Sequence, residues 1–258
     1  MEPVGDNMPI AELLEERRHL LEVAHWMLGS RVAAERVTDE AYREWYGLSD
    51  HQRARIRVPR AWLTQVVGSI SLARLAPPDH GGAAQGSVCG RGPRDACPEG
   101  EVSEVLPRTS DTLSPAERMD RAARHSLRAQ RDQPTSPRRQ DEIAQAVRQA
   151  CVDEDVTRLA SLLTPDVTAF FDSGGKVRAL TSPVTGSERV ARSLLTLLAR
   201  HPRTTLRTWP INGRTGLVAL YGDQVAAVVT LDVAGSRVVQ AWVVLNPDKL
   251  RSWNCLRP

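Results

Sequence analysis

The sequence has few aromatic residues and no long apolar run. Aromatic side chains make up only 4% of its 258 residues, and apolar residues make up 41%. Nothing approaches the run of about 18 apolar residues that a membrane-spanning helix requires. The opening residues, MEPVGDNMPIAELLEERR, contain neither the basic nor the apolar segment of a secretory signal. We therefore expect a protein of the cytoplasm that has no membrane partner.

Lysine is almost absent as well. Lys176 and Lys249 are the only two lysines, so 32 of the 34 basic residues are arginine. Such a bias is typical of GC-rich bacterial genomes, and a single arginine is most often a solvated surface residue. The formal net charge is only +3, so composition alone does not predict a nucleic-acid partner.

Cysteine is also scarce, which bears on metal sites and disulfides. The spacing of Cys89 and Cys97 fits no common zinc pattern, and no histidine pair lies near them. A disulfide framework is not expected in a protein of the cytoplasm. We expect free thiols, with Cys151 buried on a helix, and we predict no metal site and no cofactor.

Residues 1–76 are predicted to form a helical domain. Apolar side chains recur at helical spacing in three stretches between residues 10 and 75. Gly29 is a stop signal for the first helix, Ser30 is a candidate cap for the second, and Pro59 suits the first turn of the third.

The next segment, 77–140, is predicted to be a linker. It is rich in Gly, Pro and Ser, and only 113–131 shows a short helical pattern. Residues 141–258 are predicted to form a second, α+β domain. Helices open it, and alternating stretches separated by turn signals follow around an amphipathic helix that Ser187 is expected to cap.

The first domain resembles sigma region two of the extracytoplasmic-function (ECF) sigma factors. The strings MLGS at 27–30 and PRAWL at 59–63 occur in the order and separation that this family shows. The resemblance implies a set of residues that face polymerase or promoter DNA: Asp39, Glu40, Trp45, Arg60, Trp62 and Arg74.

The second domain resembles the SnoaL-like extension of one ECF subgroup, an α+β barrel shaped like a cone. Three ordered strings carry this resemblance: DSGGK at 172–176, INGRTGLVAL at 211–220 and NPDKL at 246–250. The resemblance implies that the first and last strings dock the extension on the sigma core and regulate it, although a charged turn that closes the last strand explains NPDKL equally well. The residues concerned are Asp172, Gly174, Gly175, Lys176, Asn246, Asp248 and Lys249.

The chain departs from the family where sigma region four, a helix-turn-helix, is expected. LSPAERM resembles the start of that region and DRAARHSLRAQR its last helix, but about 30 residues between them are missing. The 19 residues at 113–131 are too few for two packed helices of which the second reads the major groove. We therefore expect weak DNA binding, or none that is sequence-specific.

The SnoaL-like resemblance also implies a cavity in which acid–base chemistry takes place. The candidate catalytic residues are Asp172, His201, Tyr221 and Asp232. Asp172 is more simply explained as a turn residue, and His201 as a residue that stabilises a helix end. Trp209, Trp242 and Phe171 are candidates to line the pocket around a small-molecule ligand, although core packing accounts for them as well.

Two functions follow. The first is a degenerate ECF-like, transcription-associated protein that binds core RNA polymerase and carries a ligand-sensing or regulatory domain. The second is a SnoaL-like enzyme, of cyclase, isomerase or hydrolase type, with a structural sigma-derived domain. Retention of region two favours the first and loss of the DNA-reading module favours the second. Because no catalytic constellation is visible in the sequence, the first is preferred and the enzyme is kept as the alternative.

Overall fold

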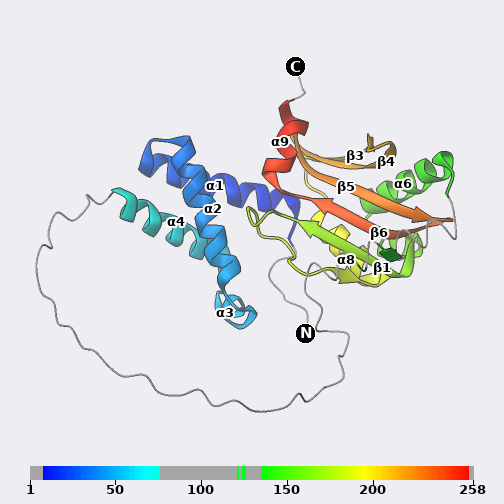
Figure 1. Cartoon of the computed structure of the whole chain (residues 1–258), viewed down its shortest axis with the longest axis horizontal. Helices are drawn as coiled ribbons and strands as arrows, with labels where there is room; N and C mark the ends of the chain where they lie inside the picture. The colour runs from blue at the N-terminus through cyan, green and yellow to red at the C-terminus, as the bar shows by residue number, and fades with distance from the viewer. Residues whose placement is uncertain (1–7, 76–120, 122–123, 126–134, 256–258) are drawn as a thin grey trace, which may run out of the picture.

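The computed structural model describes residues 8–75, 121, 124–125 and 135–255. Most of the predicted linker, including residues 77–120 and nearly all of the short helical pattern at 113–131, lies outside these residues, whereas 137–140 form the first turn of a helix. In the first domain the helices are α1 (Ile10–Leu28), α2 (Arg31–Gly47), α3 (Asp50–Arg55) and α4 (Pro59–Leu75). Figure 1 shows them as a bundle beside the sheet of the second domain.

Local signals define these helices as the sequence predicts. Gly29 ends α1 in the left-handed conformation, with φ of 65°, and the Ser30 hydroxyl caps α2 by accepting from the Ala33 amide. Pro59 begins α4. The short helix α3 is an addition to the prediction, and a capping box between Ser49 and Gln52 explains its start.

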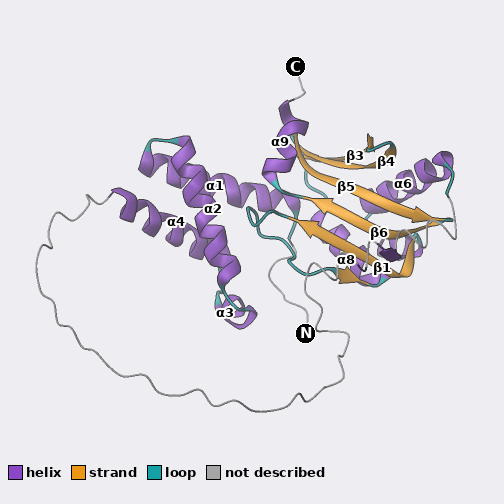
Figure 2. Cartoon of the chain, in the orientation of Figure 1, coloured by secondary structure: helices purple, strands orange, loops and turns teal. Residues whose placement is uncertain are grey.

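The second domain is α+β, as predicted (Figure 2). Its helices are α6 (Pro137–Val152), α7 (Val156–Ser161), α8 (Ser187–Leu197) and α9 (Pro247–Cys255). Its strands are β1 (Leu163–Asp172), β2 (Val184–Thr185), β3 (Thr204–Ile211), β4 (Arg214–Tyr221), β5 (Gln224–Ala234) and β6 (Arg237–Val244). Helix α6 starts four residues before the boundary expected at 141. The expectation that Ser187 caps α8 is wrong, because Gly186 occupies the cap position and makes no side-chain bond.

One mixed sheet, in the order β2-β1-β6-β5-β4-β3, organises this domain. All neighbours are antiparallel except β1 and β6. Helices α6, α7 and α8 cover its inner face, where inward residues such as Leu217 and Ala219 join one large apolar core. The outer face carries a smaller cluster, which includes Val218 and Leu220 and is closed by Leu250 of α9. The predicted Asn-Gly turn joins β3 to β4, with positive φ at both Asn212 and Gly213.

The burial of Cys151 leads to a first testable prediction. This thiol lies on α6 in the apolar core, as predicted, and burial raises its pKa to about 12. Because the thiolate is the reactive form, we expect Cys151 to resist iodoacetamide in the folded chain while the exposed Cys255 is alkylated. Peptide mass mapping measures both. Equal labelling of the two cysteines would contradict the packing of α6.

Candidate functional site: the interface between the two domains

Helix α1 belongs to both domains. Ile10, Ala11 and Leu13, in its first turns, are buried in the apolar core of the α+β domain. Leu20 and Ala24, further along the same helix, are buried in the core of the bundle. A single rigid helix therefore joins the two cores, and its middle residues lie at the interface.

A buried ion pair occupies the centre of this interface. Arg178, in the segment after β1, donates to both carboxylate oxygens of Glu16 on α1, with N–O distances between 2.8 and 3.1 Å. The two side chains are 2% and 5% exposed. The Tyr42 hydroxyl adds a third donor to the Glu16 carboxylate at 3.3 Å, and the Arg178 guanidinium lies 5.5 Å from the centre of the Trp45 ring. Such a pair fixes the relative position of its two elements, because either charge alone is costly to bury.

Main-chain groups of the segment after β1 bind the bundle next to this pair. The Tyr46 hydroxyl donates to the Val177 carbonyl at 2.5 Å and accepts from the Ala179 amide at 3.0 Å. The Arg17 guanidinium donates to the Lys176 carbonyl at 2.8 Å. These bonds hold the segment on α1 and α2 through its backbone.

Both lysines of the chain form ion pairs at the edge of this interface. The Lys176 ammonium lies 2.7 Å from a carboxylate oxygen of Asp39 on α2 and 2.7 Å from one of Asp248 on α9. The Lys249 ammonium lies 2.7 Å from Asp172 at the end of β1. The hydrogen bond from Lys176 lowers the pKa of Asp248, and the bonds from Asp248 and Asp39 raise the pKa of Lys176. The DSGGK and NPDKL strings therefore lie in contact, and the first also contacts the bundle.

Glycine is required where these two strings meet. Gly174 has a positive φ of 60°, and a Cβ there would lie 2.2 Å from the side-chain nitrogen of Asn246. The Gly174 amide donates to the Asp172 carboxylate, while the Asn246 side chain accepts from the Asp248 amide. The turn and the start of α9 are therefore fitted to one another, and Gly175, also at positive φ, continues the turn.

A second contact joins α1 to the sheet at the end of β4. The Tyr221 hydroxyl donates to the Glu15 carboxylate at 2.6 Å, and this bond lowers the pKa of Glu15 and raises that of Tyr221. Because the pKa of Glu15 is lowered, this bond stabilises the fold above the ordinary value of 4.5. The contribution is lost as the pH falls through the lower pKa of the folded state.

The sign of this shift gives a second prediction. We expect Glu15→Gln to lower the free energy of unfolding at pH 7 by about 1 kcal/mol. The difference in the free energy of unfolding between wild type and variant should become smaller as the pH falls below 4.5. Urea titrations of both chains at pH 7, 5 and 3 measure this. A gap that widens in acid would contradict the assigned hydrogen bond.

The residues expected to face polymerase or DNA separate into two groups. Asp39 lies at the interface, where it also pairs with Arg17, and Trp45 is buried at 1% exposure against the edge of Trp62. Both side chains stabilise the bundle and its contact with the second domain, so neither lies on a free surface. Trp62 is partly buried against the bundle core. The other three lie on the bundle surface, where Glu40 and Arg74 form an ion pair and Arg60 is exposed.

The four candidate catalytic residues do not converge on one cavity. Asp172 occupies the turn described above, whereas Asp232 lies at the far end of β5 and pairs with Arg214. His201 lies 5.5 Å from the Tyr221 ring, between ring centres, and accepts a hydrogen bond from the Arg203 amide. Only His201 and Tyr221 are thus neighbours, and the His201 Nδ1 atom and the Tyr221 hydroxyl are engaged with Arg203 and Glu15.

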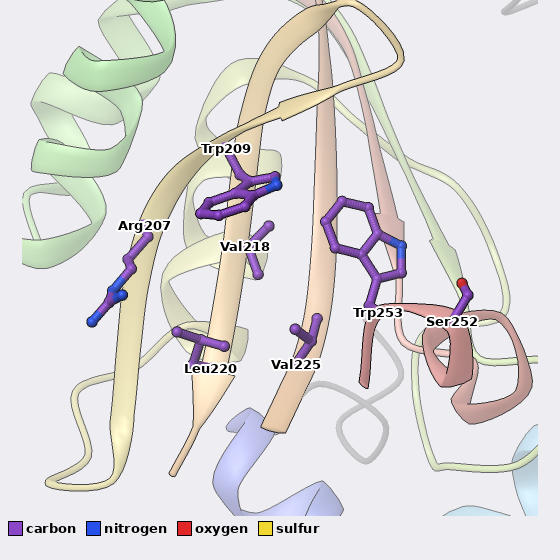
Figure 3. Close-up of a pocket in the computed structure, with 7 residues that line it drawn as sticks. All are labelled: Arg207, Trp209, Val218, Leu220, Val225, Ser252 and Trp253. Carbon is purple, nitrogen blue, oxygen red and sulfur yellow. The ribbon is translucent and has the colours of Figure 1, made fainter. Parts of the chain in front are cut away.

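The three candidate pocket residues are divided between the faces of the sheet. Phe171 packs against the core of the inner face. Trp242 stacks on Phe170, with ring centres 4.3 Å apart, and borders a cavity of about 390 Å³ near Asp232. Trp209 is half exposed and lines a different cavity, of about 410 Å³, together with Trp253 of α9 (Figure 3).

One signal for the buried ion pair is present in the sequence, although periodicity alone did not use it. Glu16 occupies an apolar position of α1, three residues after Leu13 and four before Leu20, and a charged residue on such a face requires a partner. Arg178, Tyr42 and Tyr46 had no comparable signal.

Fold and interface together define a class of protein. In this class an α+β domain follows a helical bundle in the chain and is held against it by an ion pair and hydrogen bonds. In the sequence comparison, the chain is similar to the ECF RNA polymerase sigma factor SigJ of Mycobacterium tuberculosis. The two are 26% identical over 299 residues, covering 94% of this chain and 93% of that one. The predicted resemblance to ECF sigma factors is confirmed by this match. No family model matches the chain.

Solved structures give weaker similarities. The crystal structure of SigJ from Mycobacterium tuberculosis is 24% identical, with a TM-score of 0.38, over 94% of this chain and 98% of that one. A putative SnoaL-like polyketide cyclase from Jannaschia sp. CCS1 is 14% identical, with a TM-score of 0.31, over 49% of this chain and 99% of that one.

Two properties concern the described residues alone. Among the helices of 8–75 and 135–255, none is both long and apolar enough to cross a membrane. Within the same part of the chain, no group of three or more His, Cys, Asp or Glu side chains is arranged to hold a metal ion.

Proposed function

We propose that this protein is an ECF-like, transcription-associated factor that binds core RNA polymerase through its helical bundle and is regulated by its α+β domain. The observation that carries the proposal is the buried Glu16–Arg178 pair on the shared helix α1. This pair favours one defined position of the α+β domain on the bundle. A domain that regulates the bundle requires such a defined position. The similarity to a sigma factor over 94% of the chain supports polymerase as the partner.

The surface of the bundle also favours a protein partner. Trp26 on α1 is 87% exposed, and Leu72 on α4 is 62% exposed. Large exposed apolar side chains are common at protein interfaces, and tryptophan is prominent among the residues that carry binding energy. We assign this part of the bundle, defined by Trp26 and Leu72, as the polymerase-binding surface.

The alternative, an acid–base enzyme, is less well supported by the geometry. The candidate residues occupy three separate places, and the inner face of the sheet packs against helices in one continuous apolar core. General acid–base catalysis needs its groups within hydrogen-bond reach of a common substrate. The arrangement of the described residues therefore favours the regulatory function.

The proposal includes weak or no sequence-specific DNA binding. The alignment with the sigma factor runs over 299 residues and the chain has 258, so at least 41 positions of the relative have no counterpart here. This is consistent with loss of the helix-turn-helix. A reading helix contributes about 1–3 kcal/mol of discrimination for each good base contact.

Run-off transcription with purified core enzyme tests this third prediction. We expect transcript yields from promoters with intact and scrambled upstream elements to agree within about twofold, because no bidentate contact discriminates between them. A complete ECF sigma factor on its own promoter serves as the positive control. Strong dependence on the upstream element would mean that some segment of this chain rebuilds a recognition helix.

A further inference from the structure

The outer face of the sheet carries a cavity that neither the interface nor the catalytic candidates use. Its volume is about 410 Å³, within the range of small-molecule sites. The floor consists of Val218, Leu220 and Val225 on β4 and β5, three side chains that are at most 7% exposed. Trp209 on β3 and Trp253 on α9 flank this floor (Figure 3).

This cavity is held in shape by α9. The Asn254 side chain accepts from the Val225 amide at 2.7 Å and donates to the Val225 carbonyl at 3.2 Å, which fixes the helix over the start of β5. Leu250, 4% exposed, anchors the other end of the helix in the outer-face cluster. Because the walls of this pocket are already positioned, little binding free energy is spent on ordering them when a ligand binds.

The polar groups at the rim indicate the chemistry of the ligand. Arg207 lies on β3 directly opposite Val218, with its side chain exposed at the edge of the cavity. Among the described residues, no carboxylate is paired with its guanidinium. Ser252 provides a hydroxyl at the opposite side. An apolar cavity between two indole rings with one uncompensated cation matches a planar aromatic molecule that carries an acidic group.

We propose that this cavity binds an aromatic acid, with the rings between Trp209 and Trp253 and the anionic group on Arg207. Of the three candidate pocket residues named from the sequence, the site includes Trp209 but neither Trp242 nor Phe171. It rests on the proposed function in one respect only: the same helix α9 carries Asp248 and Lys249, so a bound acid would stabilise the docked position of the domain.

The probe for this site is 1-anilinonaphthalene-8-sulfonate, an aromatic anion that fluoresces in apolar surroundings. Its uncharged counterpart, N-phenyl-1-naphthylamine, has the same rings without the sulfonate. We expect the sulfonate to bind the full chain with a stoichiometry of one. Arg207→Gln should weaken sulfonate binding about tenfold, the loss of one charge-assisted hydrogen bond, and leave binding of the uncharged probe unchanged.

Two further variants complete the test. Trp209→Ala should weaken both probes, and Arg237→Gln, an exposed strand arginine of the same domain outside the cavity, should weaken neither. Sulfonate binding that survives both Arg207→Gln and Trp209→Ala would overturn the site. The proposal would also be overturned if sedimentation showed that the wild type is an oligomer and that Trp209→Ala is a monomer. A second copy of the chain, and not a ligand, would then cover this face. The assay contains no polymerase, so its outcome is independent of whether polymerase binds.

Discussion

Replacing Glu16 by Leu is expected to destabilise the folded chain by about 3–5 kcal/mol, because Arg178 is left buried without its partner. Arg178→Met should cost a similar amount for the converse reason. Both side chains are almost fully buried from solvent. The Glu16 carboxylate also accepts a hydrogen bond from the Tyr42 hydroxyl. Burial raises the pKa of Tyr42, and the neighbouring Glu16 charge raises it further, so this tyrosine stays neutral and keeps donating.

The double variant Glu16→Leu/Arg178→Met separates charge from packing. Replacing both members of a buried pair by apolar residues of similar size is often nearly neutral, so we expect the double variant to recover most of the lost stability. The matched control is the exposed pair of Glu188 and Arg192 on α8, where Glu188→Leu should cost less than about 1 kcal/mol. Urea unfolding at pH 7 measures the wild type and all four variants. Single variants that cost no more than the control would contradict a central role for the pair.

The helices and strands were predictable because their signals are local. Gly29, Ser30 and Pro59 mark helix ends by their own backbone chemistry, and Asn212–Gly213 forms the turn that its two positive φ angles allow. Gly186 shows where such signals fail. Ser187 has the side chain of a cap, but β2 ends at Thr185 and Gly186 takes the cap position, so Ser187 is already the first residue of the helix.

The sharing of α1 between two cores was not predictable from its pattern. Leu13 and Leu20 lie on one apolar face at helical spacing, and periodicity says only that this face is buried. It does not say that different domains cover its two ends. The partners of α1 in the second domain are far away in sequence, such as Arg178, which is 162 positions from Glu16, and only the folded chain brings them together.

The DSGGK and NPDKL strings were selected through family resemblance, since their composition alone indicates only polar turns, and their docking role stays a prediction. Physical chemistry explains them once they are placed. Lys176 is a compact ammonium between two carboxylates on separate helices, a geometry that suits lysine better than the planar fork of arginine. In a chain with 32 arginines, both lysines lie in these strings.

Polymerase binding is the central claim, and the exposed Trp26 is the side chain on which we expect it to depend most. Tryptophan anchors at the centre of an interface commonly contribute 2 kcal/mol or more, which corresponds to at least about a tenfold change in affinity. Trp26→Ala should leave the fold intact, because the indole is 87% exposed. The matched control is Trp209→Ala, a half-exposed tryptophan of the other domain.

Interferometry of the full-length chain on immobilised core RNA polymerase, free of other sigma factors, tests this claim most directly. The account predicts saturable binding by the wild type, at least about tenfold weaker binding by Trp26→Ala, and unchanged binding by Trp209→Ala. Absence of binding by the wild type, or equal binding by Trp26→Ala, would contradict it.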